Sequence, residues 1–165
     1  MNFADIASEA WQILQLKEAA LHSVAQDRGK WRNALLCIGL GTLALSLCPL
    51  FFPIRVEWVT YRPDLFAVLF FALSGALARI FILFCMGLVA EKLFHSKLSA
   101  QGFFQVLGYA SLVNVLGILP GLGGISSLWL LVVTAKLLHS EGKMQGEAIF
   151  IFLFILMVIF WLLPF

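Results

Sequence analysis

The residues best suited to acid–base or metal chemistry lie near the ends of the apolar segments. They are Glu91, His95, His139, Glu141 and Glu147. Their spacing contains neither the HxxxH nor the HExxH pattern that would place two imidazoles on one helix face around a metal. The chain also has no Ser/His/Asp order, paired-carboxylate motif or nucleophile elbow. We therefore predict that this protein is not an enzyme and has no catalytic residue, no metal site and no cofactor.

A proline and three glycines interrupt the apolar stretch GYASLVNVLGILPGLGGISSLWLLV, residues 108–132. PGLGG superficially resembles a phosphate-binding loop, but it has no Lys-Ser/Thr pair and no full dinucleotide fingerprint. Pro120 stops a helix, and Gly121, Gly123 and Gly124 suit turn conformations. We predict that these residues form the bend of a helical hairpin.

Arg79 interrupts the apolar run 65–90 near its middle. An arginine at that depth costs at least about 2.5 kcal/mol on membrane-insertion scales. Ala72, Gly75 and Ala76 share its helix face, and such small residues let a second helix approach closely. The arginine is therefore expected to face another helix.

Asn114 and Ser111 lie on one face of the next apolar run, at a depth similar to that of Arg79. We predict an intramembrane polar cluster in which Arg79 bonds Asn114, Ser111 or a nearby carbonyl. The cluster would act as a structural clamp, unless the guanidinium extends to a lipid phosphate instead. A third possibility is that Arg79 binds an anionic ligand or a partner's carboxylate.

The composition places the chain in a membrane. Of its 165 residues, 62% are hydrophobic and 12% are charged, whereas soluble domains carry about 25% charged residues. A soluble fold of this size has too much surface to hide so many apolar side chains. The net charge of +2 and the absence of a basic stripe argue against a nucleic-acid partner.

The expected fold is an all-α polytopic membrane bundle of about five transmembrane helices, preceded by an amphipathic helix. Residues 1–30 form the interfacial segment, whose helix covers residues 2–25 with Asn2 as its cap. Residues 31–165 form the membrane domain. Its spans are expected at residues 33–52, 65–90, 103–119, 124–138 and 148–165. The apolar face of the first helix offers interface candidates, namely Phe3, Ile6, Trp11 and Leu14.

The basic residues predict the orientation. With the N-terminus in the cytoplasm and five crossings, the C-terminus lies outside. Most lysines and arginines then fall on the cytoplasmic side, and only Arg55 and Arg62 face outward. Trp58, Gly121 and Phe165 are also expected outside.

The pattern resembles the Yip1 domain family of small five-span membrane proteins. The resemblance rests on WQILQLKEAAL in the N-terminal helix, VAEKLFHSK after the second span, FFQVLGYASLVNVLGILPGLGGISSLWLLVV, and EGKMQGEAIF before the last span. It covers most of the chain. The short cytosolic N-terminal part resembles prokaryotic members, which implies a bacterial inner membrane. The family contributes no catalytic residues.

Two functions of different classes remain open. One is a non-enzymatic scaffold or accessory subunit that binds other membrane proteins, or a second copy of itself, within the lipid bilayer. The other is a small transporter or permease for an ion or an amphiphile. Intramembrane carboxylates would favour transport, and none is expected in the middle of a span. We therefore favour the accessory subunit.

Overall fold

The computed structural model describes residues 3–52, 54–56, 59–61, 63–120 and 122–162. Asn2, Trp58, Gly121 and Phe165, which carry sequence predictions, lie outside the described residues. The described elements are α1 (Phe3–Leu14), α2 (Glu18–Gln26), η1 (Arg28–Lys30), α3 (Trp31–Phe51), β1 (Ile54–Val56), β2 (Val59–Tyr61), α4 (Leu65–Lys92), α5 (Ala100–Ala110), η2 (Ser111–Ile118), α6 (Leu122–Ser140) and α7 (Gly146–Leu162).

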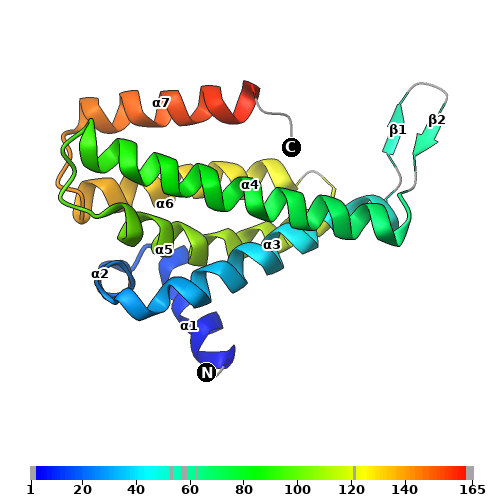
Figure 1. Cartoon of the computed structure of the whole chain (residues 1–165), viewed down its shortest axis with the longest axis horizontal. Coiled ribbons are helices and arrows are strands. Elements are labelled where there is room, and N and C mark those ends of the chain that lie inside the picture. Colours follow the sequence, from blue (N-terminus) through cyan, green and yellow to red (C-terminus); the bar gives the residue numbers. More distant parts are fainter. Residues whose placement is uncertain (1–2, 53, 57–58, 62, 121, 163–165) are drawn as a thin grey trace.

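The long helices run back and forth along one axis, in the order α3, α4, α5 continued by η2, α6 and α7 (Figure 1). Four helical segments in the described chain are long and apolar enough to cross a membrane, which fits an integral membrane protein. They are Arg28–Phe51, Leu65–Lys92, Ala100–Ile118 and Leu122–Ser140. The predicted helical membrane bundle is confirmed at this level. The fifth predicted span is represented by a shorter apolar stretch, Gly146–Val158.

Two local predictions about the membrane segments needed correction. The short polar connector after the first span, for which no strand was predicted, contains an antiparallel hairpin in which Ile54 pairs with Tyr61 and Val56 with Val59. The third span is not one α-helix, because α5 gives way to the 3₁₀ helix η2 at Ser111. In contrast, α4 is continuous over its whole length and contains no break at Gly75.

The N-terminal amphipathic segment is two helices, not the single helix predicted for residues 2–25. Leu16 adopts a positive φ of 59° between them, a conformation that an L side chain rarely takes inside a helix. The amide of Lys17 bonds the carbonyl of Gln12, which closes the end of α1. The chain therefore turns, and α1 and α2 lie at an angle to each other (Figure 1).

The core is centred on α5, the most enclosed of the long helices. It contacts α1, α2, α3 and α4. The N-terminal helices share this core, since Ile6, Ile13 and Leu21 belong to the same buried cluster as Phe103 and Val106. The segment 1–30 thus packs on the membrane bundle and does not form a core of its own among the described residues.

Glycines let α3 approach α5 and η2 closely. A Cβ built on Gly108 would lie 2.6 Å from the Cβ of Ala34, and one on Gly41 would collide with the backbone of Ser111. Such contacts between small residues are the usual way in which membrane helices pack without large side chains between them.

Two caps and one aromatic cluster fix the ends of the bundle. Asp64 caps α4 through the amide of Ala67 at 2.7 Å, and Ser99 caps α5 through the amide of Gly102 at 3.1 Å. Phe152 of α7 is fully buried. Its ring meets Phe94 and Phe103 edge to face, with centroids 5.7 and 5.9 Å away, and this contact attaches α7 to the bundle.

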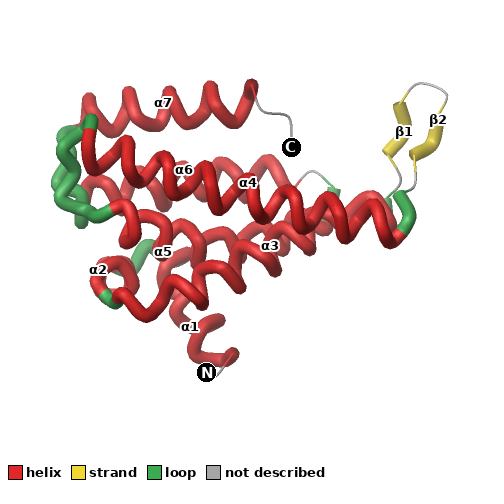
Figure 2. Tube along the Cα trace, in the orientation of Figure 1, coloured by secondary structure: helices red, strands yellow, loops and turns green. Residues whose placement is uncertain are grey.

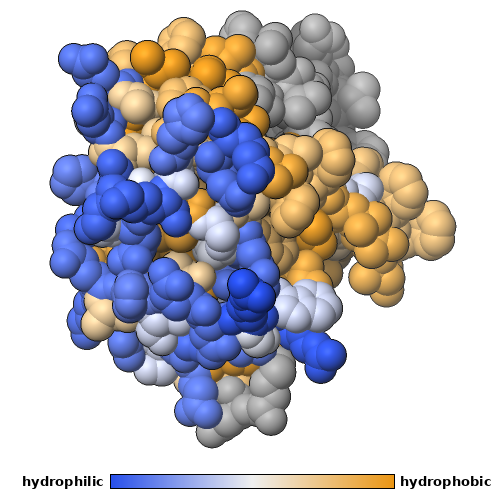
Figure 3. All heavy atoms as spheres, turned by 60° about the vertical axis from the view of Figure 1, so that its left-hand side comes forward, coloured by the Kyte–Doolittle hydropathy of each residue, from blue (hydrophilic) through white to orange (hydrophobic). Residues whose placement is uncertain are grey.

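Loops and polar side chains gather at one end of the bundle. The loops 93–99 and 141–145 lie there beside α2 (Figure 2), and the amide of Lys97 bonds the carbonyl of Gly142 across them. Figure 3 shows hydrophilic side chains over this end and hydrophobic side chains on the helices that extend away from it. We call α2 and these two loops the polar end.

Candidate functional site

Arg79 lies near the middle of α4, on the stripe that also carries the buried residues Val68, Ala72 and Met86. The side chain as a whole is partly exposed. Its Nη1 atom, however, is buried and has no hydrogen-bond partner within the described chain. A guanidinium offers five N–H donors, so at least part of this group is enclosed without the acceptor it needs.

The predicted bond between Arg79 and Asn114 or Ser111 is not formed. Asn114 is 1% exposed, and both its amide nitrogen and its amide oxygen lack a partner among the described residues. Its Cβ lies beside Gly41 of α3. Ser111, the first residue of η2, donates to the carbonyl of Leu107 in α5 at 2.8 Å, four residues earlier in the same span. The prediction failed because close packing on α3 sets the direction in which these side chains point.

The predicted bend lies at Leu119 and Pro120. The residue before a proline is driven out of helical conformation, and Leu119 accordingly has an extended backbone with ψ near 130°. Gly123 and Gly124 were predicted to lie in the bend. They are instead helical residues at the start of α6. Pro120 therefore ends η2, and neither Gly123 nor Gly124 is needed to turn the chain.

The predicted interface residues of the first helix separate into two pairs. Phe3 and Trp11 are 63% and 62% exposed. Ile6 is buried, and Leu14 is partly buried against the core. Only Phe3 and Trp11 remain accessible to a partner or to lipid.

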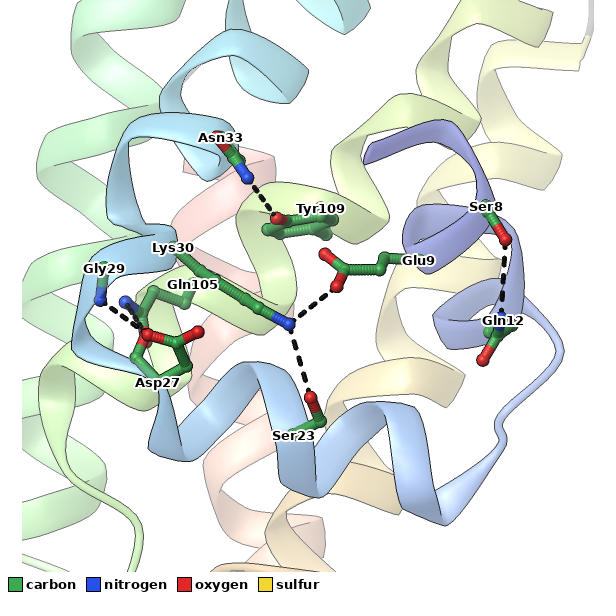
Figure 4. A network of polar contacts seen from close by, with 10 residues as sticks. All are labelled: Ser8, Glu9, Gln12, Ser23, Asp27, Gly29, Lys30, Asn33, Gln105 and Tyr109. Carbon is green, nitrogen blue, oxygen red and sulfur yellow. Dashed lines mark hydrogen bonds and ion pairs between the residues drawn. The ribbon is translucent and has the colours of Figure 1, made fainter. Parts of the chain in front are cut away.

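A network of polar contacts, not foreseen from the sequence, joins α1, α2 and η1 (Figure 4). Lys30 is its centre, and its side chain is only 15% exposed. Its Nζ donates to Glu9 Oε1 at 2.7 Å and to Ser23 Oγ at 3.3 Å. A charge this far removed from water needs such acceptors, so the network holds the two N-terminal helices against the start of α3.

The same network continues onto α5. Asn33 Nδ2 donates to the hydroxyl of Tyr109 at 2.9 Å, and Gln105 Nε2 donates to the carbonyl of Asp27 at 3.0 Å. The carboxylate of Asp27 accepts the amide of Gly29 at 2.9 Å, which shapes the turn into η1. The signal in the sequence is the dense polar run AQDRGKWRN, but its partners lie far away in the chain.

A second set of contacts fastens α1 and α2 to α6. Trp129 Nε1 donates to the carbonyl of Leu14 at 3.1 Å. Glu18 pairs with Lys136, and His22 Nδ1 lies 2.9 Å from Glu141 Oε2. The hydrogen bond and the positive charge of Lys136 hold the pKa of Glu18 below its ordinary value of 4.5.

The titratable residues at the helix ends do not assemble into a metal site in the part of the chain that is described. Glu91 accepts the amide of Ala100 at 2.8 Å and pairs with Lys92 at 2.9 Å, while Glu141 faces His22. These carboxylates thus serve local structure. Cys37, Cys48 and Cys85 are free thiols.

A cavity of about 470 Å³ opens beside the Lys30 network. It is lined by Asp5, Ile6, Glu9, Asp27, Gly29, Lys30, Arg32 and Asn33. Pockets for small molecules commonly measure about 300–1,000 Å³, so this one, which is widely open to its surroundings, has the size to hold a small polar group. Its lining carries charges of both signs.

Comparison with protein-family models, with curated proteins and with solved structures gives no match to this chain. The resemblance to the Yip1 domain family therefore stays a prediction from the sequence pattern.

Proposed function

We propose that this protein is a non-enzymatic accessory subunit that binds another membrane protein through the Arg79 side of α4. The observation that carries the proposal is the buried Nη1 of Arg79, which has no acceptor within the described chain. A cation in the middle of a span is costly, by at least about 2.5 kcal/mol. A carboxylate on a partner helix would offset that cost by pairing with the part of the side chain that is exposed.

The expected partner is a different protein. The nine acidic residues of the chain all lie in the N-terminal segment, in the connectors or at helix ends. Examples are Asp64 at the start of α4 and Glu91 at its end. A second copy therefore has no carboxylate at the depth of Arg79. We infer that the partner supplies an aspartate or glutamate from within a transmembrane helix.

We also propose that the polar end faces the cytoplasm of a bacterium and that the C-terminus lies outside its inner membrane. Support for the orientation comes from Lys97 and Lys143, which lie in the two loops of the polar end, and from Arg28, which follows α2 by two residues. Cytoplasmic loops carry an excess of such basic residues.

The test is a photo-activated cross-linker placed at Ala78, which is partly exposed and next to Arg79. We expect one membrane protein to be captured in cells, with the cross-link lost in Arg79→Leu and kept in Arg79→Lys. Leu73, exposed on the face of α4 opposite to Ala78 and Arg79, is the control position and should not capture that protein. The decisive step exchanges the charges. Arg79→Glu should lose the partner, and an arginine at the partner's acidic position should restore it.

Cross-links that are equally strong in Arg79→Leu would contradict the proposal, as would capture of lipid alone. The transporter alternative has its own readout. If the purified protein in liposomes moved an ion or an amphiphile, and Arg79→Leu stopped that movement, Arg79 would belong to a transport pathway.

A further inference from the structure

The cavity beside Lys30 lies where α3 begins, at the border between polar and apolar surface. Its walls come from α1, from the turn at Asp27 and Gly29, and from the first residues of α3. Some of its charges are already engaged, since Lys30 and Glu9 neutralise each other at 2.7 Å. The question is what the remaining charges could bind.

Arg32 provides the available positive charge. Its side chain is exposed, and its guanidinium lies 5.5 Å from the ring centroid of Trp31. It has no ion pair with any residue that the structure describes. A guanidinium held over an aromatic ring keeps its N–H groups free at the edge, and these suit the oxygens of a phosphate.

Asp5 and Asp27 provide the available negative charge on the same cavity. Asp5 is exposed and has no side-chain hydrogen bond within the described chain, and Asp27 uses one carboxylate oxygen for the amide of Gly29. The free oxygens can accept the three N–H bonds of an ammonium group. One cavity thus presents a donor set for a phosphate and an acceptor set for an amine.

We propose that this cavity binds an ethanolamine phosphate group, in which an ammonium and a phosphate are two carbons apart, as the headgroup of a membrane phospholipid. The phosphate lies against Arg32 and the ammonium against Asp5 and Asp27. The lipid source follows from the surroundings. Trp31, which stands between the lining residues Lys30 and Arg32, is exposed, tryptophan favours the headgroup layer, and α3 runs directly from the cavity into an apolar span.

The experiment uses the whole protein in detergent, titrated with three lipids of equal acyl chains and analysed by native mass spectrometry. Phosphatidylethanolamine offers both groups with free N–H bonds. Phosphatidylcholine has no N–H bonds, and phosphatidylglycerol has no amine. We expect phosphatidylethanolamine to be retained about tenfold better than either of the others, which is the difference one charge-assisted hydrogen bond makes.

Arg32→Gln and Asp5→Asn should each remove that preference. Both side chains are exposed, so both variants are expected to keep the thermal stability of the parent. Arg28→Gln, which changes an exposed arginine outside the cavity lining, is the matched control and should bind like the parent. Soluble phosphoethanolamine distinguishes the sources, because displacement of the lipid at equal concentration would assign the site to the free compound.

Equal retention of the three lipids would overturn the proposal. A preference for phosphatidylglycerol that depends on Arg32 would also overturn it, because the site would then be a simple anion site. Since Arg79 plays no part in this cavity, failure here leaves the proposed binding of a partner protein unaffected.

Discussion

The two central helical hairpins differ in how far they extend. The hairpin of α3 and α4 is joined at its far end by β1 and β2, which lie beyond all the other elements (Figure 1). The hairpin of η2 and α6 turns at Leu119 and Pro120, where Gly117 and Gly123 lie beside Leu45. Because α3 continues past Leu45 to Phe51, the second hairpin is the shorter one.

The sequences of the two hairpins also differ, in the number of charged residues at their far ends. The connector of the longer hairpin, IRVEWVTYRPD, contains four charged residues, whereas residues 98–135 contain none. The whole of α6 is long enough to cross a membrane, but its uncharged part before Lys136, residues 122–135, is about 21 Å long at about 1.5 Å per residue. With Lys136 at the polar border, this part is shorter than the ~30 Å of a hydrocarbon layer. We therefore expect the shorter hairpin to turn inside the apolar layer. Helices that are equally apolar need not reach the same surface.

The largest expected effect comes from breaking the seam that sets the two hairpins side by side. Gly41→Leu would place a side chain against the backbone of Ser111, where even a Cβ collides. Overpacking of this kind costs about 1–3 kcal/mol or more, so the protein should lose its monodisperse form in detergent. Gly39→Leu changes the same helix at a position with no atom within 4 Å and should be tolerated. Equal stability of the two variants would show that the seam does not hold the hairpins.

The depth of the shorter hairpin can be measured by cysteine labelling after Cys37, Cys48 and Cys85 are replaced by serine. A membrane-impermeant maleimide should react with Leu119→Cys about tenfold more slowly than with Thr60→Cys, because a thiol in hydrocarbon ionises less readily. Leu119 is 51% exposed, so the protein itself does not shield it. Equal rates would place both turns in water.

Asn114 provides a test of the polar atoms within the shorter hairpin. Since neither end of its amide has a partner among the described residues, Asn114→Leu should leave thermal stability unchanged or raise it, by up to about 1–3 kcal/mol. Thr42→Val is the control, because the hydroxyl of Thr42 already bonds the carbonyl of Ile38 at 2.7 Å. A clear loss of stability in Asn114→Leu would mean that the amide has a bonding partner after all, for example an ordered water.

The smallest expected effect is the pH dependence of the ion pair between Glu18 of α2 and Lys136 of α6. Lys136 lowers the pKa of Glu18 in the folded state, so this pair contributes stability above the ordinary pKa of 4.5 and loses it as the pH falls through the lowered value. Hydrogen exchange of α2 should therefore show less protection in acid, and Glu18→Gln should show the weaker protection at both pH values. An identical pH response in Glu18→Gln would assign the effect to another group.

Composition and local pattern were sufficient to predict the membrane bundle, four of the helical spans and the position of the bend. These features depend on runs of apolar residues and on Pro120, whose effect on Leu119 is local. In each case the residues that carry the signal lie in the same span as the feature they predict, or within one helical turn of it.

The remaining features depend on contacts that the sequence does not encode locally. The break at Leu16 needs a positive φ that its residue type does not favour. The bond predicted for Asn114 is not formed, because the face of η2 that carries Asn114 packs closely on α3 at Gly41. The Lys30 network was missed because its members are distant in the chain, with Asn33 and Tyr109 separated by 76 residues. Such pairs become visible only once the helices are packed.

The contacts between the N-terminal helices and α6 impose an order on biosynthesis. They join Leu14 to Trp129, Glu18 to Lys136 and His22 to Glu141, over separations of 115, 118 and 119 residues. At about 5–20 residues per second, translation takes on the order of 6–24 s to cover that distance. During this interval α1 and α2 can pack their apolar faces on α5, but the polar contacts that fasten them to α6 cannot yet form. The polar attachment of α1 and α2 is therefore among the last parts of the fold to be completed.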